Sequence, residues 1–185
     1  MDFNFSDKIN YIIEKSGIWT LTKVLQCEKD SLAKGDNVHI EKLPPENTDE
    51  KSGIIKLNIY SFSTKTTDTA IISADDFEGY FEPNSEVNDA IMKYNDYNQE
   101  YKKMHKPAVV EIIIIALMIA ADLAMTFIKP LLVIIPTVIA LVALILFIKD
   151  YEKLYRAKSN FSFNESKINN ILNESAGKVN KILRK

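Results

Sequence analysis

The chain has 185 residues, with 23 Lys and Arg, 25 Asp and Glu, and a formal net charge of −2. A single cysteine, Cys27, excludes an internal disulfide framework and any multi-cysteine metal site, and two distant histidines, His39 and His105, leave little for a zinc centre. The small net charge hides a split. Residues 1–106 hold 19 acidic and 13 basic residues, whereas residues 149–185 hold 4 acidic and 9 basic residues.

The first 83 residues have the pattern of a small α+β domain. Isoleucines at positions 9, 12 and 13 share one face of a predicted short helix over 6–16. Four β-rich segments follow between turn signals, at 18–27, 37–43, 54–62 and 69–73. We expect a small antiparallel sheet or partial barrel with a helix, and Trp19 in its core.

Residues 84–106 predict a polar juxtamembrane helix. Its apolar and aromatic residues recur close to every 3.5 positions, which is the spacing of a helix that packs along one seam. These residues are Val87, Ile91, Tyr94, Tyr97, Tyr101 and Met104. We expect this helix to run almost directly into the apolar segment that follows.

Residues 107–148 contain only three charged side chains, Glu111, Asp122 and Lys129. As helices, residues 107–128 and 131–148 would be roughly 33 Å and 27 Å long, each close to the ~30 Å hydrocarbon core of a bilayer. One helix over the whole region would be about twice too long. The sequence therefore predicts a two-span transmembrane helical hairpin, with Pro130 beginning the second helix.

The two spans differ in strength. The second has 14 Leu, Ile, Val or Phe residues and no charge, and each such residue favours insertion by about 0.3–0.6 kcal/mol. The first has 11 such residues, and Asp122 opposes its insertion by up to about 3 kcal/mol. We expect the first span to depend on the second, or on copies of itself.

Two stripes follow the first span. Glu111, Asp122 and Lys129 lie within about 20° of one another on a helix, so they predict a polar intramembrane face towards a pore, a cavity or a partner. In the alternative, Glu111 and Lys129 reach the two head-group layers, and only Asp122 is intramembrane. A separate small-residue stripe predicts close helix packing, and it consists of Ala116, Ala120 and Ala124.

Basic residues flank both spans and set the predicted topology. Lys102, Lys103 and Lys106 precede the first span. The positive-inside rule then places both termini in the cytoplasm of an integral membrane protein, in the plasma or inner membrane if the source is bacterial. The residues after the second span either contact anionic lipid head groups or only fix the topology. They are Lys149, Lys153, Arg156 and Lys158.

The last segment, 149–185, predicts a basic juxtamembrane region and a C-terminal amphipathic helix. Residues 162–165 (SFNE) have the form of a capping box and predict a helix start. The helix face could pack on 84–106, self-associate, lie on the membrane or dock on the N-terminal domain. We favour docking, because a basic tail complements an acidic domain.

No pattern of catalytic or metal-ligating residues emerges, and we predict no enzyme activity and no cofactor. The acidic cluster at 75–86 lacks the spacing of a calcium loop, and the acidic N-terminal domain argues against nucleic-acid binding. The sequence favours a membrane-anchored interaction or assembly (scaffold) module that self-associates and presents residues 1–106 to a protein partner. The alternative is a pore or channel former. Its layout is similar to that of some phage holins, although an N-terminal domain of this size departs from them.

Overall fold

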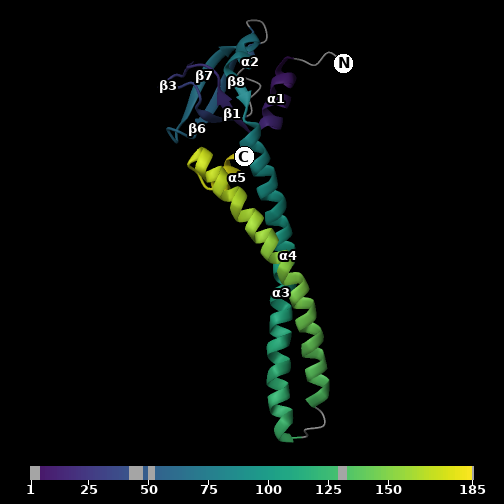
Figure 1. Ribbon diagram of the computed structural model, residues 1–185. Coiled ribbons are helices and arrows are strands. Elements are labelled where there is room, and N and C mark those ends of the chain that lie inside the picture. Colours follow the sequence, from purple (N-terminus) through teal and green to yellow (C-terminus); the bar gives the residue numbers. More distant parts are fainter. Residues whose placement is uncertain (1–4, 42–47, 50–52, 129–132, 185) are drawn as a thin grey trace. The chain divides into compact units, whose positions relative to one another are not determined.

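A computed structural model describes residues 5–41, 48–49, 53–128 and 133–184. It divides into two compact units (Figure 1). The first comprises Met1–Met92 together with Asn164–Lys185, and the second is Lys93–Phe163.

The first unit is built on an antiparallel sheet. Its strand order is β5-β6-β4-β1-β8, and β7 also pairs with β6. Strands β2 and β3 form a separate two-stranded sheet. The strands are β1 (Ile18–Leu21), β2 (Leu25–Gln26), β3 (Ser31–Leu32), β4 (Asn37–Ile40), β5 (Thr48–Asp49), β6 (Ile54–Ser61), β7 (Thr67–Ser73) and β8 (Phe81–Pro83). The helices are α1 (Phe5–Ser16), a 3₁₀ turn η2 (Ala74–Asp76) and α2 (Phe77–Tyr80).

The core of this unit follows from strand alternation. Every second residue of β6 is buried, beginning with Ile55, and the same alternation holds along β7. Trp19 is only 2 % exposed, and its ring meets Phe77 and Phe81 edge-on at centroid distances of 5.4 and 6.3 Å. The predicted sheet and the core position of Trp19 are confirmed.

The predicted strand over 18–27 is broken into β1 and β2. Thr22 interrupts it, because its N–H donates to the carbonyl of Tyr80 (2.9 Å) and its hydroxyl donates to that of Gly79 (2.6 Å). These bonds hold the backbone of Thr22 against the end of α2 instead of a neighbouring strand. Sequence alternation could not reveal this, because the partner lies nearly sixty residues away.

Two asparagines fix the start of α3 (Ser85–Ile128) on the sheet. Asn84 accepts a hydrogen bond from the N–H of Val87 (3.0 Å), which caps the helix, and its amide donates to Asn37 (2.8 Å) on β4. Asn88 brackets Ile18 of β1: its Oδ1 accepts from the N–H and its Nδ2 donates to the carbonyl, at 3.0 and 2.9 Å.

The predicted helix start at Ser162 is wrong. Helix α4 runs from Ile134 to Leu172 without interruption, because residues 137–172 contain neither glycine nor proline. It ends before Asn173, whose positive φ of 52° turns the chain. A short helix, α5 (Ala176–Leu183), follows.

The C-terminal segment docks on the sheet domain, as predicted, but the charges are reversed at the contact of its buried carboxylate, Glu174. Glu174 is 5 % exposed and accepts from Lys178 at 2.7 Å, and it also pairs with Lys65, between β6 and β7, at 3.6 Å. Hydrogen bonding from Lys178 lowers the pKa of Glu174 despite the opposing effect of burial, and the charge of Lys65 adds to this. The expected pairing, a basic residue of the C-terminal segment with an acidic residue of the preceding part of the chain, occurs between Lys167 and Glu86 (2.9 Å).

The second unit consists of the long arms of α3 and α4, which run antiparallel side by side (Figure 1). Both helices are long and apolar enough to cross a membrane. Helix α3 continues from the predicted juxtamembrane segment into the apolar one, with Pro107 inside it. Continuity of these two segments is therefore confirmed. The predicted break at Pro130 lies outside the residues that the structure describes.

Replacing Asn88 by alanine should destabilise the first unit. The change removes both side-chain bonds to Ile18 and leaves its backbone groups without those partners, which we expect to cost about 2 kcal/mol. Thermal unfolding of the full chain in mild detergent, followed by circular dichroism, measures the loss. Asn170→Ala, at an exposed position of α4, is the control. An equal effect of both changes would contradict the bracketing role.

Glu174→Gln should destabilise the protein in a pH-dependent way. The lowered pKa of Glu174 means that folding favours its ionised form, so this stabilisation is complete above the ordinary glutamate pKa of about 4.3 and is lost as the pH falls below it. We expect the melting temperature to fall by about 2–4 °C at pH 7 for a loss of about 1 kcal/mol. The difference from wild type should shrink as the pH is lowered below about 4.3, whereas exposed Glu100→Gln should not lower the melting temperature at pH 7. A gap that does not shrink on acidification would refute the assignment.

Candidate functional site in the helical hairpin

A single seam of less exposed residues runs along α3 through both the polar and the apolar part. Its members are separated alternately by three and four residues, which is the spacing of helices that pack in a coiled-coil manner. The seam consists of Val87, Ala90, Tyr94, Tyr97, Tyr101, Met104, Ala108, Glu111, Ile115, Met118, Asp122 and Met125. The predicted juxtamembrane repeat and the predicted polar stripe are thus two halves of one helix face.

Helix α4 carries a matching seam with the same alternation. Its members are Pro136, Ala140, Ala143, Phe147, Asp150, Leu154, Ala157 and Phe161. Phe161 stacks on Tyr94 and Tyr101 of α3, with ring centroids 4.7 and 6.5 Å apart. Small residues, including Ala108 at 2 % exposure and Ala143 at 8 %, let the helices approach.

The apolar segments are mostly exposed: only 6 % and 11 % of the 18-residue stretches of highest hydropathy in α3 and α4 are buried. Large apolar side chains such as Leu123 (63 %), Phe127 (89 %) and Ile145 (66 %) are exposed. A core helix of a water-soluble domain would bury such residues. Their exposure is compatible with insertion in a membrane.

Asp122 lies at the centre of a polar contact between the apolar arms. Its Oδ2 accepts a hydrogen bond from the hydroxyl of Thr137 at 3.1 Å, and the same hydroxyl lies 2.8 Å from the carbonyl of Val133. One hydroxyl hydrogen faces two acceptors, so the two contacts compete for it. A side chain at position 122 that brought its own hydrogen would satisfy both.

Two carboxylate oxygens on this seam have no partner among the described residues. They are Oδ1 of Asp122 and Oε2 of Glu111, and both atoms are buried. The predicted polar face therefore turns towards α4 of the same chain, and only one of its four carboxylate oxygens has a hydrogen bond shown to the other helix. An unpaired polar atom in an apolar setting costs about 1–3 kcal/mol, which makes this contact the strained point of the hairpin. Lys129, the third predicted member, lies outside the described residues.

The small-residue stripe occupies a different face. Ala116, Ala120 and Ala124 are all exposed in the single chain, so the hairpin does not use them for its own packing. Their predicted role in close helix packing stays a prediction.

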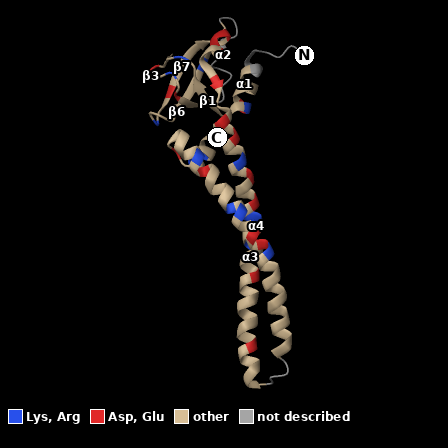
Figure 2. Ribbon diagram, viewed as in Figure 1, with Lys and Arg blue, Asp and Glu red and all other residues tan. Residues whose placement is uncertain are grey.

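Charge gathers in a band just beyond the apolar arms (Figure 2). The predicted lipid-contact residues Lys149, Lys153, Arg156 and Lys158 are all exposed there. Lys153 pairs with Asp150 at 3.9 Å and Arg156 with Glu152 at 2.6 Å. The other two form no ion pair within the part of the chain that the structure describes.

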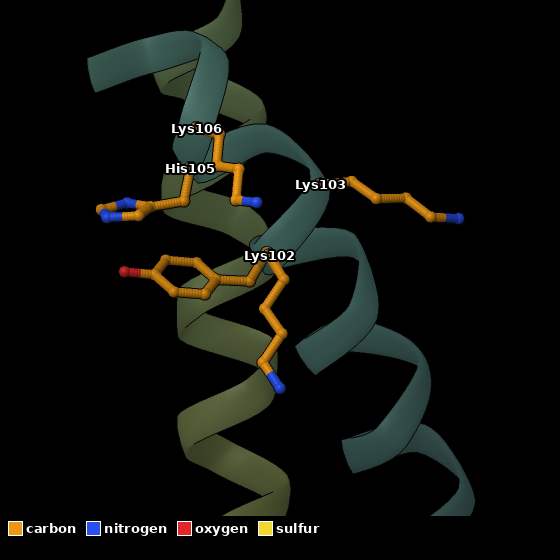
Figure 3. A pocket seen from close by; sticks show the side chains of 5 residues that line it. Lys102, Lys103, His105 and Lys106 are labelled. Atoms are coloured by element: carbon orange, nitrogen blue, oxygen red, sulfur yellow. The ribbon is translucent and has the colours of Figure 1, made fainter. Parts of the chain in front are cut away.

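The lysines of α3 reach this band from the other arm. Lys102, Lys103, His105 and Lys106 surround a hollow of about 470 Å³ next to Tyr101. Figure 3 shows Lys103 pointing away from the side of the helix that carries His105. The hollow is therefore formed by long flexible side chains around one helix.

Two further residues of the first unit, Cys27 and Asp68, have shifted pKa values. Burial, together with the charges of Asp68 and Asp30, raises the pKa of the Cys27 thiol to about 11, so the reactive thiolate is scarce at neutral pH. Burial also acts on Asp68, but N–H donors of Thr69, Asp30 and Lys29 outweigh it and lower its pKa. No group of three metal-ligating side chains occurs within residues 5–41, 48–49, 53–128 and 133–184.

Comparison of the chain with known protein families, with curated proteins and with solved structures finds no match. The class of protein is thus defined by its architecture: an antiparallel sheet domain, two long apolar helices and a short C-terminal helix.

Thr137 is the member of the site that sequence reasoning missed. A lone threonine in an apolar span usually bonds to its own helix, as Thr126 does to the carbonyl of Asp122 at 2.8 Å. The available signal was the position of Thr137 and Asp122 on opposite sides of the predicted turn, which an antiparallel hairpin brings together.

Asp122 and Thr137 should be energetically coupled. In a double-mutant cycle of Asp122→Leu and Thr137→Val, we expect a coupling of about 0.6–1.7 kcal/mol, the range for hydrogen bonds between membrane helices. Asp122→Asn should retain most of it, because its amide donates a hydrogen. Unfolding in mixtures of mild detergent and dodecyl sulfate measures each variant. Thr126→Val is the control, and equal coupling of Asp122 to Thr126 would disprove a specific pair.

Proposed function

We propose that the protein is an integral membrane protein that acts as an oligomeric assembly module. The hairpin formed by α3 and α4 would anchor it, and the sheet domain would be presented to a protein partner on the cytoplasmic side. The observation that supports the proposal most is the exposed apolar surface of both arms. Only 6 % and 11 % of the 18-residue stretches of highest hydropathy in α3 and α4 are buried.

The distribution of charge supports this orientation. Both arms are basic at the end that joins the sheet domain, through Lys102, Lys103 and Lys106 on α3 and through the residues 149–158 of α4. Lysine and arginine beside a span favour the cytoplasmic side. Both termini would therefore be cytoplasmic, and the connection between the arms would lie on the opposite side.

Two features of the hairpin favour self-association. Its inner seam leaves an oxygen of Asp122 and one of Glu111 without a partner, and an apolar environment penalises such atoms. On another face of α3, Ala116, Ala120 and Ala124 are exposed and would let a second helix approach closely. A second hairpin would bury the alanine face, and a small rotation of the arms would bring the carboxylates a partner.

A pore is the second candidate. The two partnerless carboxylate oxygens favour it, because a water-filled lumen would hydrate them. Against it, Asp122 already contacts Thr137 within the same chain, and a lumen would require several hairpins to open this contact.

Cysteine crosslinking should distinguish an assembly from a monomer. In a Cys27→Ser background, Ala120→Cys should form a disulfide-linked dimer in membranes, because the alanine face is exposed and apolar. Ile119→Cys, which is exposed and lies about 100° from Ala120 around α3, should crosslink much less. Non-reducing gel electrophoresis after mild oxidation reads out both variants. A strictly monomeric pattern for Ala120→Cys would refute the assembly proposal.

Dye release separates the assembly module from the pore. Vesicles loaded with a small dye and containing the wild-type protein should remain sealed if it is an assembly module. Release that is abolished by Asp122→Leu would instead establish the pore. The same vesicles should be tested with the Ala120→Cys variant and crosslinked, so that the absence of dye release is measured on assembled protein.

A further inference from the structure

A second cavity lies between the two arms of the hairpin, beside the apolar segments. We call it the interhelical pocket, and its volume is about 500 Å³, within the range of small-ligand sites. Helix α3 contributes Tyr101 and His105, and helix α4 contributes tyrosines, serines and a lysine. The lining residues that matter here are Tyr101, His105, Tyr151, Tyr155, Lys158 and Ser162.

The pocket wall is held by aromatic contacts. Tyr101 stacks on His105 with ring centroids 5.3 Å apart. About two helical turns before Tyr101, Tyr94 of α3 stacks on Phe161 of α4 with ring centroids 4.7 Å apart. On α4, the ring of Tyr151 packs on Phe147 at 5.6 Å. Yet Tyr151 and Tyr155 remain 52 % and 64 % exposed, so their hydroxyl groups are available to a ligand.

The charge around the pocket is positive, and its lysine has no ion-pair partner in the part of the chain that the structure describes. Nearby carboxylates of α4 are already used, since Asp150 pairs with Lys153 and Glu152 with Arg156. Lys158 forms no ion pair among the described residues, and the same holds for Lys102 and Lys106 on the adjoining hollow. The pocket therefore combines hydroxyl and ring N–H donors with an unpaired cation, which is the donor set for a phosphate group.

The position of the pocket selects the source of that phosphate. His105 lies two residues before the first apolar segment and Tyr151 lies three residues after the second, roughly 3–5 Å along a helix axis. A head-group layer is roughly 5–7 Å thick on each side of the hydrocarbon core. In the membrane orientation proposed above, the floor of the pocket would thus lie at the level of lipid phosphates.

We propose that the interhelical pocket binds the phosphate head group of an anionic phospholipid. Lys158 supplies the charge, Tyr101 and Tyr155 supply hydroxyl donors, and the exposed apolar residues below take the acyl chains. This proposal rests on the proposed membrane location but not on the proposed assembly. It goes beyond a general attraction of basic residues to the membrane, because it assigns selectivity to the residues that line one cavity.

The test uses the full chain in mild detergent, with native mass spectrometry to count bound lipids. We expect phosphatidylglycerol to bind at least fivefold more tightly than phosphatidylcholine with the same acyl chains. Lys158→Gln should weaken phosphatidylglycerol binding about fivefold, or about 1 kcal/mol, because it removes the lysine that lines the pocket. Tyr101→Leu should reduce it too, with the helical circular dichroism unchanged.

Lys149→Gln is the matched control, because Lys149 is an exposed lysine of the same band that forms no ion pair among the described residues and lines neither hollow. It should change the affinity less than twofold. Equal losses for Lys149→Gln and Lys158→Gln, or equal binding of the two lipids, would overturn the proposal.

Soluble anions distinguish the two sources of phosphate. Inorganic phosphate or glycerol phosphate at the lipid concentration should not displace phosphatidylglycerol, because neither carries acyl chains. Displacement with equal affinity would overturn the lipid assignment in favour of a soluble ligand. The result is independent of the crosslinking test, since lipid binding is counted on the monomer, and extraction of cell membranes at alkaline pH tests the membrane location separately.

Discussion

The structure depends on one packing constraint, the alternation of three and four residues that continues along α3 from Val87 to Met125. A helix can keep one face against a partner over such a length only if that face repeats with a period near 3.5. The seam changes its chemistry along the way, from tyrosines in the polar part to aliphatic and acidic residues in the apolar part, without changing its period. The same two helices can therefore pair along both their polar and their apolar parts.

That continuity explains why α3 passes Pro107, as expected, and why α4 passes the helix start predicted at Ser162. Pro107 removes one backbone donor from α3, and Ser162 offers a cap to α4, yet neither interrupts its helix. Each would cost or gain only a few kcal/mol locally. Packing along the shared seam acts on many residues, and Phe161, one position before the predicted cap, is held by stacking on Tyr94 and Tyr101.

Local patterns predicted the elements well and their partners poorly. Alternation located the long strands β6 and β7, and the apolar run located both arms, because these signals depend on neighbours in sequence. The break at Thr22 depends on Tyr80, and the docking contact of Glu174 depends on Lys65, so neither could be read from a window of sequence. Net charge predicted that the tail docks, but a sum over segments does not determine which side chain is buried. The same limit hid Thr137 and the interhelical pocket, both of which require the register of the hairpin.

The acidic residues Glu111 and Asp122 are the exception to the good packing of the apolar seam, because each has a buried carboxylate oxygen without a partner among the described residues. An apolar residue at position 122 would remove the penalty for a buried carboxyl group, and it would also remove the contact with Thr137. The hydroxyl of Thr137 has one hydrogen and two acceptors, so the bond to Asp122 competes with the bond to the carbonyl of Val133. Oδ1 of Asp122 still has no partner on either arm among the described residues. A hydrogen-bond partner for this oxygen must therefore be water or another molecule. In a pore it would be water, and in an assembly it would be a second protein chain.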